Sequence, residues 1–362
     1  MSDVLIVGAG IMGLMTARVL ALAGCRVTVL ERGEPGREAS WAGGGIVSPL
    51  YPWRYSPAVT ALAAEARRAY PVLVDELREE TGIDAELVPC GMLMLDAEDA
   101  RDALAWAQAQ GEPLERHDQA SLRATMPWLA QDWHEGLLMP GIAHVRNPRL
   151  LKALQASLQR LGVSVIPHAE VVAAAVSGAS ITSLRASDGR DYSADKIVVC
   201  GGAWSRGLLE IMQMAALPPV RPVMGQMLMY RLEPGTLPCM VMAEGRYVLQ
   251  RRDGHLLCGS TLEETGFDKT ITSSARASLM ASAERLLPAL AGVEPVMQWA
   301  GLRPGSPNGI PFIGRVPDKD NLWVNAGQYR NGLVLAPASA TLLADVLLGR
   351  TPVLDPAPYQ CL

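Results

Sequence analysis

Apolar and polar positions change from strand to helix spacing at the start of the chain. Residues 3–7 (DVLIV) are typical of a fully buried strand, and a helical pattern then runs to about Ala23, where Gly24 ends it. Residues 26–30 (RVTVL) predict a second strand, which Glu31 ends. The opening of the chain therefore predicts a β-α-β unit with two parallel strands.

Further along the chain, the spacing of apolar residues changes several times between the patterns of strands and of helices. Residues 219–262 alternate in the manner of antiparallel strands, whereas residues 197–200 (IVVC) and 321–327 (NLWVNAG) are typical of buried strands. Further helices are expected over residues 58–81, 97–110, 118–126, 147–161, 272–287 and 332–348, further strands at 163–166, 170–176, 181–186, 191–193 and 293–304, and a loop over 36–57. Parallel signals thus occur at the start, middle and end. We predict a cofactor domain assembled from separated segments, into which an antiparallel domain is inserted.

One helix start is predicted in more detail. Asn147 precedes Pro148, and these residue types are favoured at the N-cap and at the first helical position. Gly162 is a typical residue after a helix C-terminus. The sequence therefore assigns Asn147 the role of the N-cap.

A glycine-rich turn joins the first predicted strand to the first predicted helix. Its sequence, Gly8-Ala-Gly10-Ile-Met-Gly13, has the G-x-G-x-x-G spacing of dinucleotide-binding folds. The first glycine permits a tight turn, the second lets the backbone approach a pyrophosphate, and the third allows close packing of helix and sheet. The helix N-terminus offers N–H groups to phosphates, and Glu31 stands where an acceptor for ribose hydroxyls belongs. We favour this interpretation over a merely glycine-rich turn with a surface glutamate.

The turn alone leaves NAD and FAD open as the cofactor. The acidic residue Glu31 disfavours a 2′-phosphate, and hence NADP. No second G-x-G-x-x-G occurs in the sequence, which predicts a single dinucleotide. If that dinucleotide is FAD, we expect a small substrate to reduce it directly.

Three further glycine-rich segments are candidates for cofactor contact. Residues 39–46 (ASWAGGGI) lie in a predicted loop, residues 197–205 (IVVCGGAWS) end a buried strand, and residues 326–332 (AGQYRNG) join a strand to the last helix. Glycines permit close approach of the backbone to a flat ring or a phosphate, and the N-terminus of the last helix suits a flavin's pyrimidine ring. A flexible loop, or glycines needed only for packing, is the alternative that the sequence leaves open.

Arg303 and Tyr247 are candidate substrate-binding residues. Arg303 lies in an otherwise apolar stretch, residues 299–304 (WAGLRP), and arginine is rarely buried without a partner. That partner is either a substrate carboxylate held by both arms of the guanidinium or a structural salt bridge. Tyr247 lies in an alternating strand, where an ordinary core tyrosine is the alternative. Residues 49–55 (PLYPWRY) are either a lid over a pocket or plain surface.

Composition and charge exclude several classes of protein. The chain has 362 residues, of which 49% are hydrophobic and only 19% charged, so a disordered protein is excluded. The net charge is −5 and Lys and Arg form no run, so neither nucleic acid nor a membrane surface is an expected partner. The five histidines form no H-x-x-x-H pair and the six cysteines no C-x-x-C, so we expect neither a metal site nor a disulfide framework.

The sequence predicts no targeting or membrane segment. The N-terminal residues MSDVLIVGAG lack a basic region and are interrupted by glycines, unlike a signal peptide. The apolar stretch 332–348 contains Pro337 and Asp345 and is short for a membrane span. We therefore expect a cytoplasmic protein that does not cross a membrane.

Taken together, the motifs resemble a known family. The chain contains, in order, DVLIVGAGIMG with Glu31-Arg32, the SWAGGGI loop, GGAWS, RPVMGQ at 221–226, AGLRP at 300–304 and QYRNGLVLAP at 328–337. This series resembles the FAD-dependent D-amino acid oxidase family, and within it the glycine oxidases of thiamine biosynthesis. The resemblance covers essentially the whole chain, and the joint spacing is more specific than any single motif.

The resemblance implies an α/β (α+β) fold with non-covalently bound FAD. A Rossmann-like FAD-binding domain would comprise the discontinuous segments 1–85, 141–217 and 303–362, and an inserted antiparallel-sheet substrate domain would comprise 86–140 and 218–302. The implied FAD-binding residues are Gly8, Gly10, Ile11, Met12, Gly13, Glu31, Arg32, Ser40, Gly44, Gly45, Ile46, Val171, Gln328, Tyr329, Arg330, Asn331, Gly332, Leu333 and Val334. Arg303 matches the arginine that binds the substrate carboxylate, Tyr247 the tyrosine beside it, and Arg330 a second arginine close to the flavin.

The implied activity is oxidative deamination of glycine or a similar small amine, such as sarcosine or a small D-amino acid. Hydride transfer to the flavin gives an imine, which water converts to a 2-oxo acid and ammonia, and oxygen becomes hydrogen peroxide. A dehydrogenase with a quinone or protein acceptor stays open as the alternative, and so does a non-catalytic flavin-binding subunit. The preferred amine is open too, because Leu262 stands where these oxidases have a methionine near the pocket. We also expect a homo-oligomer that supplies thiazole formation.

Overall fold

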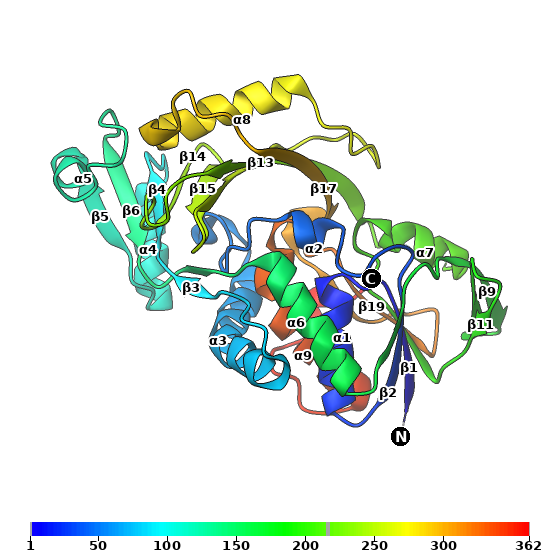
Figure 1. The fold of residues 1–362 in the computed structure, drawn as a ribbon. Coiled ribbons are helices and arrows are strands. Elements are labelled where there is room, and N and C mark those ends of the chain that lie inside the picture. Colours follow the sequence, from blue (N-terminus) through cyan, green and yellow to red (C-terminus); the bar gives the residue numbers. More distant parts are fainter. Residues whose placement is uncertain (1, 215–217, 362) are drawn as a thin grey trace.

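Two large β-sheets organise the molecule (Figure 1). The structure is a computed structural model that describes residues 2–214 and 218–361. One large sheet is parallel apart from one edge strand, and the other is antiparallel apart from one strand pair. The site described below lies between these two sheets.

The parallel sheet carries the beginning of the chain. In spatial order its strands are β18 (Phe312–Arg315), β19 (Leu322–Ala326), β12 (Lys196–Val199), β1 (Asp3–Val7), β2 (Arg26–Leu30) and β8 (Ser164–Ile166). Neighbours pair in parallel except β18, which is antiparallel to β19. These strands are short apolar runs because both faces of the sheet are covered. The carboxyl ends of the parallel strands meet at one edge, where open α/β sheets bind their ligands.

Different layers cover the two faces of the parallel sheet. One face carries the helices α1 (Ile11–Leu22), α3 (Pro57–Thr81), α6 (Asn147–Arg160) and α9 (Gly332–Leu348), and α9 packs against α1 and α3. The other face carries α7 (Ser205–Ile211) and a small sheet of β9 (Val171–Ser177), β10 (Ser180–Ala186) and β11 (Asp191–Tyr192). Alternate side chains of β1 divide between these layers, which fixes the orientation of the turn that follows it.

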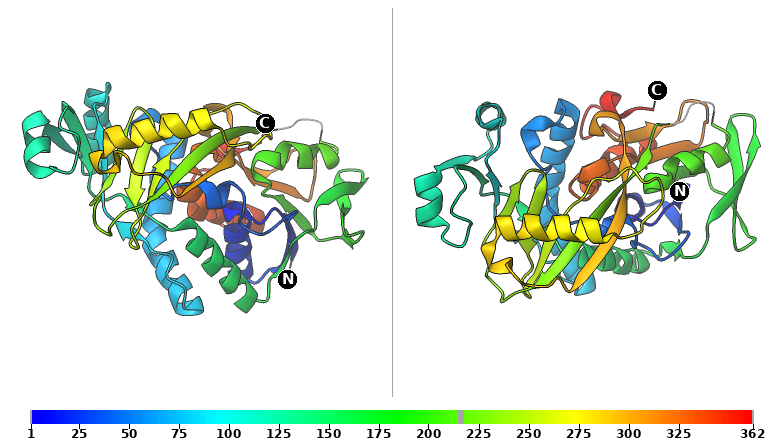
Figure 2. Two further views of the ribbon diagram at one scale, coloured as in Figure 1. Left: turned by 45° about the horizontal axis from the view of Figure 1, so that its top comes forward. Right: turned by 90° about the horizontal axis from the view of Figure 1, so that it is seen from above.

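The second large sheet has eight strands. In order they are β17 (Met297–Gly305), β13 (Arg221–Arg231), β16 (His255–Gly259), β15 (Arg246–Gln250), β14 (Met240–Ala243), β4 (Met92–Leu95), β6 (Glu135–Met139) and β5 (Glu115–Asp118). Helix α8 (Ser273–Leu286) lies along the outer face (Figure 2). The remaining α-helices and strands of the described chain are α2 (Ala39–Ala42), α4 (Ala100–Gln110), α5 (Gln119–Thr125) and the pair β3 (Val88–Pro89) and β7 (Ala143–His144).

The inner face of this sheet is rich in methionine. Met92, Met94, Met227, Met240 and Met242 are all buried in the cluster that contains Tyr247, whereas α8 packs on the opposite face. Strand alternation therefore directs the methionines toward the other half of the molecule. A thioether adapts its shape to irregular space, so this face can conform to what lies against it.

Most predicted elements lie where the sequence placed them, within a few residues. Asn147 is an exception, because α6 already begins at this residue and Arg146 stands at the N-cap. The predicted loop over 36–57 contains the short helix α2, and β18 was not predicted. The proposed domain segments follow the two large sheets except at β17, which crosses residue 302. Residue 217, another proposed boundary, lies outside the described residues, and the domain boundaries stay a prediction.

One helical segment of the described chain has the length and composition of a membrane span. It runs from Tyr329 to Leu348, and 67% of its most apolar window is buried inside the molecule. This burial is typical of a core helix, and α9 does pack within the largest apolar cluster. The expectation that the stretch is too short therefore needs correction by a few residues, since the helical turn at 329–331 lengthens it.

Candidate functional site

A groove between the two large sheets consists of two adjoining pockets. One pocket lies over the turn after β1 and reaches Glu31, Val171 and Trp204, and the other extends beneath the antiparallel sheet to Tyr247 and Arg303. Gly10, Ser40 and Cys200 are among the residues that line both. The first pocket has a cavity volume of about 280 Å³ and the second a cavity volume of about 170 Å³.

The turn after β1 is held so tightly that only glycine fits at two positions. Gly8 has φ +105°, and a Cβ there would lie 2.5 Å from the carbonyl oxygen of Cys200. A Cβ on Gly13 would lie 1.8 Å from the carbonyl oxygen of Gly8. Gly13 lines neither pocket, and its role is the close approach of α1 to the turn. This approach brings the N-terminus of α1, with Gly10, Ile11 and Met12, to the wall of the groove.

Helix α2 supports this turn from the other side of the groove. The hydroxyl oxygen of Ser40 accepts a hydrogen bond from the backbone N–H of Ile11 at 2.8 Å. A Cβ on Gly10 would lie 3.2 Å from that same hydroxyl oxygen. Ser40 thus joins the predicted phosphate turn to the loop 39–46, and it lines both pockets.

Glu31 closes the first pocket at the end of β2. One carboxylate oxygen accepts the N–H of Ala9 at 2.7 Å and the other the N–H of Gly33 at 3.0 Å. These two bonds orient the carboxylate toward the groove and leave lone pairs for further donors. The arrangement suits the two hydroxyl groups of a ribose.

A loop from the antiparallel half reaches the first pocket. The Arg32 guanidinium lies 3.6 Å above the ring of Trp204, which stacks on Phe267 with ring centroids 5.4 Å apart. Lys269 and Arg32 both pair with Glu38, at 3.0 and 2.8 Å. The loop that carries Phe267 and Lys269 therefore connects the two halves of the molecule beside this pocket.

The loop at Gly43–Gly45 is clamped from three directions. The Asn147 amide donates to the carbonyl oxygens of Ser40 and Gly43, at 2.9 and 3.1 Å. A Cβ on Gly45 would lie 2.0 Å from the Val145 carbonyl oxygen, and one on Gly44 would lie 2.4 Å from the Tyr247 hydroxyl. Asn147 thus positions the glycine loop rather than capping α6, which explains why the N-cap prediction was wrong.

Arg251 is a buried residue that sequence reasoning missed. Its guanidinium donates to Nδ1 of His144 at 2.8 Å, to the Val145 carbonyl at 2.9 Å and to the Gly44 carbonyl at 2.8 Å. Burial, with the neighbouring Arg251 charge, lowers the pKa of His144 to about 3, and burial lowers the pKa of Arg251 to about 10. His144 therefore stays neutral and accepts through Nδ1. Arg251 binds the end of β15 to the glycine loop.

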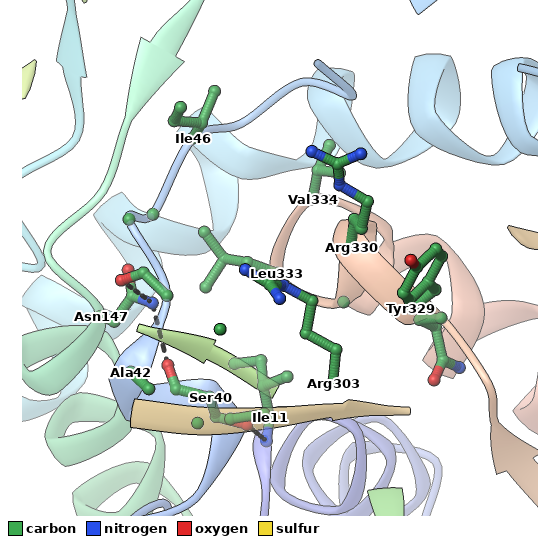
Figure 3. Close-up of a pocket in the computed structure, with 18 of the residues that line it drawn as sticks. Ile11, Ser40, Ala42, Ile46, Asn147, Arg303, Tyr329, Arg330, Leu333 and Val334 are labelled. Carbon is green, nitrogen blue, oxygen red and sulfur yellow. Dashed lines mark hydrogen bonds between the residues drawn. The ribbon is translucent and has the colours of Figure 1, made fainter. Parts of the chain in front are cut away.

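Arg303 projects into the second pocket from β17 (Figure 3). Its Nη1 donates to the carbonyl oxygens of Met224 and Thr261, both at 3.2 Å, and its Nη2 donates to the Ser260 hydroxyl. Its hydrogen-bond partners in the described chain are all neutral oxygens, so the structural salt bridge is not its role here. Burial lowers the pKa of Arg303, and a half-buried guanidinium with no carboxylate among its hydrogen-bond partners in the described chain favours an anionic ligand.

Tyr247 lies in the same pocket, and its hydroxyl group makes only a weak hydrogen bond within the described chain. The hydroxyl donates to the Met227 sulfur at 3.6 Å, and a thioether is a weak acceptor. Burial raises the pKa of Tyr247, so the group stays protonated and remains a donor. Arg303 and Tyr247 thus offer N–H and O–H donors to one end of the pocket.

The segment 328–334 forms the opposite wall. Gln328, Tyr329, Arg330, Gly332, Leu333 and Val334 line the second pocket. Gln328 donates to Asn325 at 2.6 Å, which donates to Thr16 on α1 at 3.2 Å. Asn331 does not line the pocket, and its buried amide nitrogen has no hydrogen-bond partner in the described chain. The N-terminus of α9 therefore faces the pocket, as the sequence predicted.

The structure brings nearly all of the predicted site residues to this groove. Only Gly13 and Asn331 lie behind its wall. Leu262, which the resemblance places near the pocket, lines neither pocket and is 55% exposed, although its neighbour Thr261 accepts a hydrogen bond from Arg303. Ala42 and Gly43 of the candidate segment 39–46, and Leu50 of the segment 49–55, also line the second pocket. The lining residues that sequence reasoning did not single out include Asn147, Gly225, Met227, Ser260 and Gly301. The RPVMGQ and AGLRP motifs contain two of them, but motifs alone do not state which residues face a ligand.

The groove fits an extended dinucleotide with a flat ring system. Glycines of the turn after β1 and of the loop 43–45 line the groove, the N-terminus of α1 meets its middle, and Glu31 meets one end. The other end is enclosed by glycines, by the α9 N-terminus and by two arginines. The structure offers no cluster of His, Cys, Asp and Glu for a metal ion within the ranges that it describes. The glycines, the N-termini of α1 and α9, and Glu31 at this groove are residues that suit FAD.

Comparison with known proteins gives concordant matches. A glycine oxidase of Pseudomonas aeruginosa is 53% identical over 357 residues, which cover 98% of this chain and 97% of the relative. The crystal structure of glycine oxidase from Geobacillus kaustophilus superposes with a TM-score of 0.93 at 30% identity, covering 99% of this chain and 98% of that one. A bifunctional ThiO/ThiG protein of Synechocystis is 34% identical over 96% of this chain and 52% of its own length.

The family comparison covers almost the whole chain. The profile described as DAO, FAD dependent oxidoreductase, matches residues 3–346. This range includes the phosphate turn, Glu31, the glycine loop, Tyr247, Arg303 and the α9 N-terminus, which together form the groove. The chain belongs to the DAO family of FAD-dependent oxidoreductases.

Proposed function

We propose that this chain is an FAD-dependent glycine oxidase. It would convert glycine, or a similar small amine such as sarcosine or a small D-amino acid, to an imine and then to a 2-oxo acid and ammonia, with oxygen reduced to hydrogen peroxide. The main support for the proposal is the Arg303 guanidinium, which points into the second pocket and, among the described residues, donates hydrogen bonds only to neutral oxygens. The names of the full-length relatives support oxygen as the acceptor over a quinone or a carrier protein.

The proposed cofactor residues follow the groove. Glu31, Arg32 and Val171 would hold the adenosine half, the turn at Gly8–Gly13 with Ser40 the pyrophosphate, and residues 44–46 and 328–334 the flavin half. When bound, FAD supplies the capacity to accept the two electrons and the hydrogen of a C–H bond. The protein supplies binding, orientation and electrostatics.

Arg303 and Tyr247 would hold the two oxygens of the substrate carboxylate. A guanidinium can donate two parallel hydrogen bonds to a carboxylate, and the Tyr247 hydroxyl donates a further one. With the carboxylate fixed at one end, a two-carbon amine has little freedom left, so its α-carbon is held in one place. The apolar lining from Ile46, Leu50 and Met227 excludes water from the remaining volume.

The pocket contains no protein base for the amine. None of the described residues that line it is Asp, Glu or His. The substrate must therefore lose its ammonium proton to solvent on the way to the buried site, where the Arg303 cation disfavours a second positive charge. Arg330, exposed at the pocket wall, adds to this effect.

The cellular setting is part of the proposal. A cytoplasmic homo-oligomer that contacts neither membranes nor nucleic acid agrees with the net charge of −5 and the burial of the 329–348 segment. A role in thiamine biosynthesis, at the formation of the thiazole ring, rests on the family resemblance and on the ThiO/ThiG relative.

Anaerobic mixing with a panel of small amines tests the proposal directly. The purified holoprotein should be yellow, and glycine should bleach its flavin absorbance without any second protein. Admission of air should restore the colour and yield one hydrogen peroxide per substrate, measured with a coupled peroxidase. A flavin that glycine, sarcosine and D-alanine all leave oxidised would refute the proposed activity, and reoxidation only by a quinone would refute the acceptor.

A further inference from the structure

Two glycines face each other across neighbouring strands at the roof of the second pocket. Gly225 on β13 pairs with Gly301 on β17 in the antiparallel register. Both residues line the pocket, and both are buried. Glycine weakens a strand interior, so a facing pair in the longest strands of this sheet calls for an explanation.

Gly225 lies directly beneath the Arg303 guanidinium. A Cβ built on Gly225 would be 2.2 Å from Nη2, 2.3 Å from Nη1 and 2.5 Å from Cζ of Arg303. These distances are far inside van der Waals contact, so a methyl group and the guanidinium cannot occupy these positions together. The arginine thus lies in space that the missing side chain of Gly225 leaves open.

Gly301 leaves space for a different neighbour. A Cβ on Gly301 would be 2.6 Å from the Cβ of Ala42 at the end of α2, and no Arg303 atom is among its nearest neighbours. One glycine of the pair therefore accommodates the arginine and the other accommodates the helix that leads to the glycine loop.

The hydrogen bonds of Arg303 show why the space above Gly225 matters for its orientation. Its hydrogen bonds to Met224 O, Thr261 O and the Ser260 hydroxyl fix how the guanidinium lies on the sheet. The Met224 carbonyl belongs to the peptide bond just before Gly225, so the same short piece of β13 provides an acceptor and the open space. A bidentate grip depends on the plane of the guanidinium, and any side chain at position 225 would change that plane.

We propose that Gly225 is a positioning residue for substrate binding. Because it has no side chain, the Arg303 guanidinium can lie against the strand in the orientation that directs it toward the substrate carboxylate. This inference rests on the proposed function of Arg303. The RPVMGQ motif, which contains Gly225, would therefore orient Arg303 in addition to forming part of β13.

A single methyl group tests this inference. In Gly225→Ala the atoms in conflict belong to the end of a long side chain, so the arginine moves and the strand persists. Alanine in place of glycine also lowers the entropy of the unfolded chain. We therefore expect unchanged FAD affinity and an unchanged melting temperature, and an apparent KM for glycine raised by about ten- to a hundredfold, as loss of one charged hydrogen bond implies.

A double-mutant cycle with Arg303→Ala separates this role from a general structural one. If Gly225 acts only through the guanidinium, Gly225→Ala will not raise the KM further in the Arg303→Ala background. Acetate provides a second readout, because this carboxylate has no amine to oxidise; we expect it to bind to Arg303 and to shift the flavin absorbance. Its dissociation constant should rise in parallel with KM in each single variant.

Two other glycines provide controls. In Gly136→Ala, on β6 of the same sheet, the new methyl group would meet only the ends of Leu122 and Leu93, both at 2.9 Å, and KM should be unchanged. In Gly301→Ala the conflict is with α2, so the FAD dissociation constant should rise. These two variants show whether the effect of an added methyl group on KM depends on its position next to Arg303.

The outcomes distinguish the inference from the function on which it rests. An unchanged KM in Arg303→Ala would refute the proposed role of Arg303, and the inference with it. A raised KM in Arg303→Ala, together with wild-type KM and acetate binding in Gly225→Ala, would overturn the inference alone. So would additive effects in the cycle, or a Gly225→Ala protein that unfolds or releases FAD.

Discussion

The two ends of the groove differ in what surrounds their glycines. At the phosphate turn, a Cβ on Gly8 or Gly13 would meet backbone carbonyl oxygens, at 2.5 and 1.8 Å. At the substrate end, a Cβ on Gly225 or Gly259 would meet the ends of long side chains, those of Arg303 and Met227. Backbone cannot move without moving its strand or helix, whereas a methionine or arginine end changes rotamer at small cost.

This difference separates a rigid part of the site from an adjustable one. The cofactor end is made of backbone and glycine and suits a ligand that stays the same. The substrate end is made of Met227, Tyr247 and Arg303 on a methionine-rich sheet face, where substitutions alter shape and affinity without breaking the fold. We therefore expect mutations at the first end to abolish function and those at the second to change its magnitude.

The largest effect is expected from Gly13→Ala at the rigid end. The new methyl group would overlap the Gly8 carbonyl, so α1 must move away from the turn. We expect a colourless protein whose free energy of unfolding falls by about 3 kcal/mol or more. Flavin release and urea unfolding measure both. Gly141→Ala is the control, because Gly141 lines neither pocket and a Cβ there would have no neighbour within 4 Å. A Gly13→Ala protein that keeps its full FAD content would contradict the contrast between the two ends.

The next largest effect is expected from Arg303→Ala at the adjustable end. Each hydrogen bond to a charged group contributes roughly 1.5–3 kcal/mol, and a bidentate grip makes two. The KM for glycine should therefore rise by about two to four orders of magnitude while FAD stays bound. Arg303→Lys should lie between, since a point charge cannot reproduce the fork. If both variants also lost their flavin, the two ends would not be separable as we describe.

A smaller effect is expected from low pH, which should lower the free energy of unfolding through His144, a residue near the glycine loop between the two ends. The pKa of His144 is about 3, against 6.5 for the free side chain, so below pH 6.5 the unfolded chain takes up a proton that the folded chain does not. Stability due to this residue is then lost as the pH falls from 6.5 toward 3, by about 2 kcal/mol at pH 5. Urea unfolding at pH 7 and 5 checks this value against His144→Asn, in which the loss should be smaller. Equal losses in the two proteins would show that His144 does not titrate as expected.

The smallest effect is expected from Tyr247→Phe. Among the described residues, the only hydrogen-bond partner of its hydroxyl is the Met227 sulfur, so the melting temperature should not change. Loss of one donor to the carboxylate should raise KM for glycine by about tenfold, the lower end of the range for a hydrogen bond to a charged group, with kcat little affected. A destabilised variant would mean that the hydroxyl belongs to the rigid part of the site.

The rigid phosphate end of the groove could be predicted from the sequence more fully than the substrate end. The phosphate turn, Glu31 and the first strands were predictable because their spacing lies within one β-α-β unit. Arg251 and Gly225 were not, because each acts on a residue far away in the chain: Gly44 and Arg303. Asn147 shows the limit most clearly, since its local pattern indicates a helix cap while its amide binds Ser40 and Gly43. Side chains that join distant segments leave no local periodicity.

The position of α9 in the chain sets the order in which this protein can be completed during synthesis. The helix fills the core between α1 and α3, yet it is translated some three hundred residues after α1. At roughly 5–20 residues per second, the nascent N-terminal unit waits on the order of tens of seconds for its packing partner. The wall at 328–334 emerges together with α9, so the pocket closes only then. Cofactor capture is consequently one of the last events in the making of the molecule, and chaperones have that interval in which to protect the exposed face of the parallel sheet.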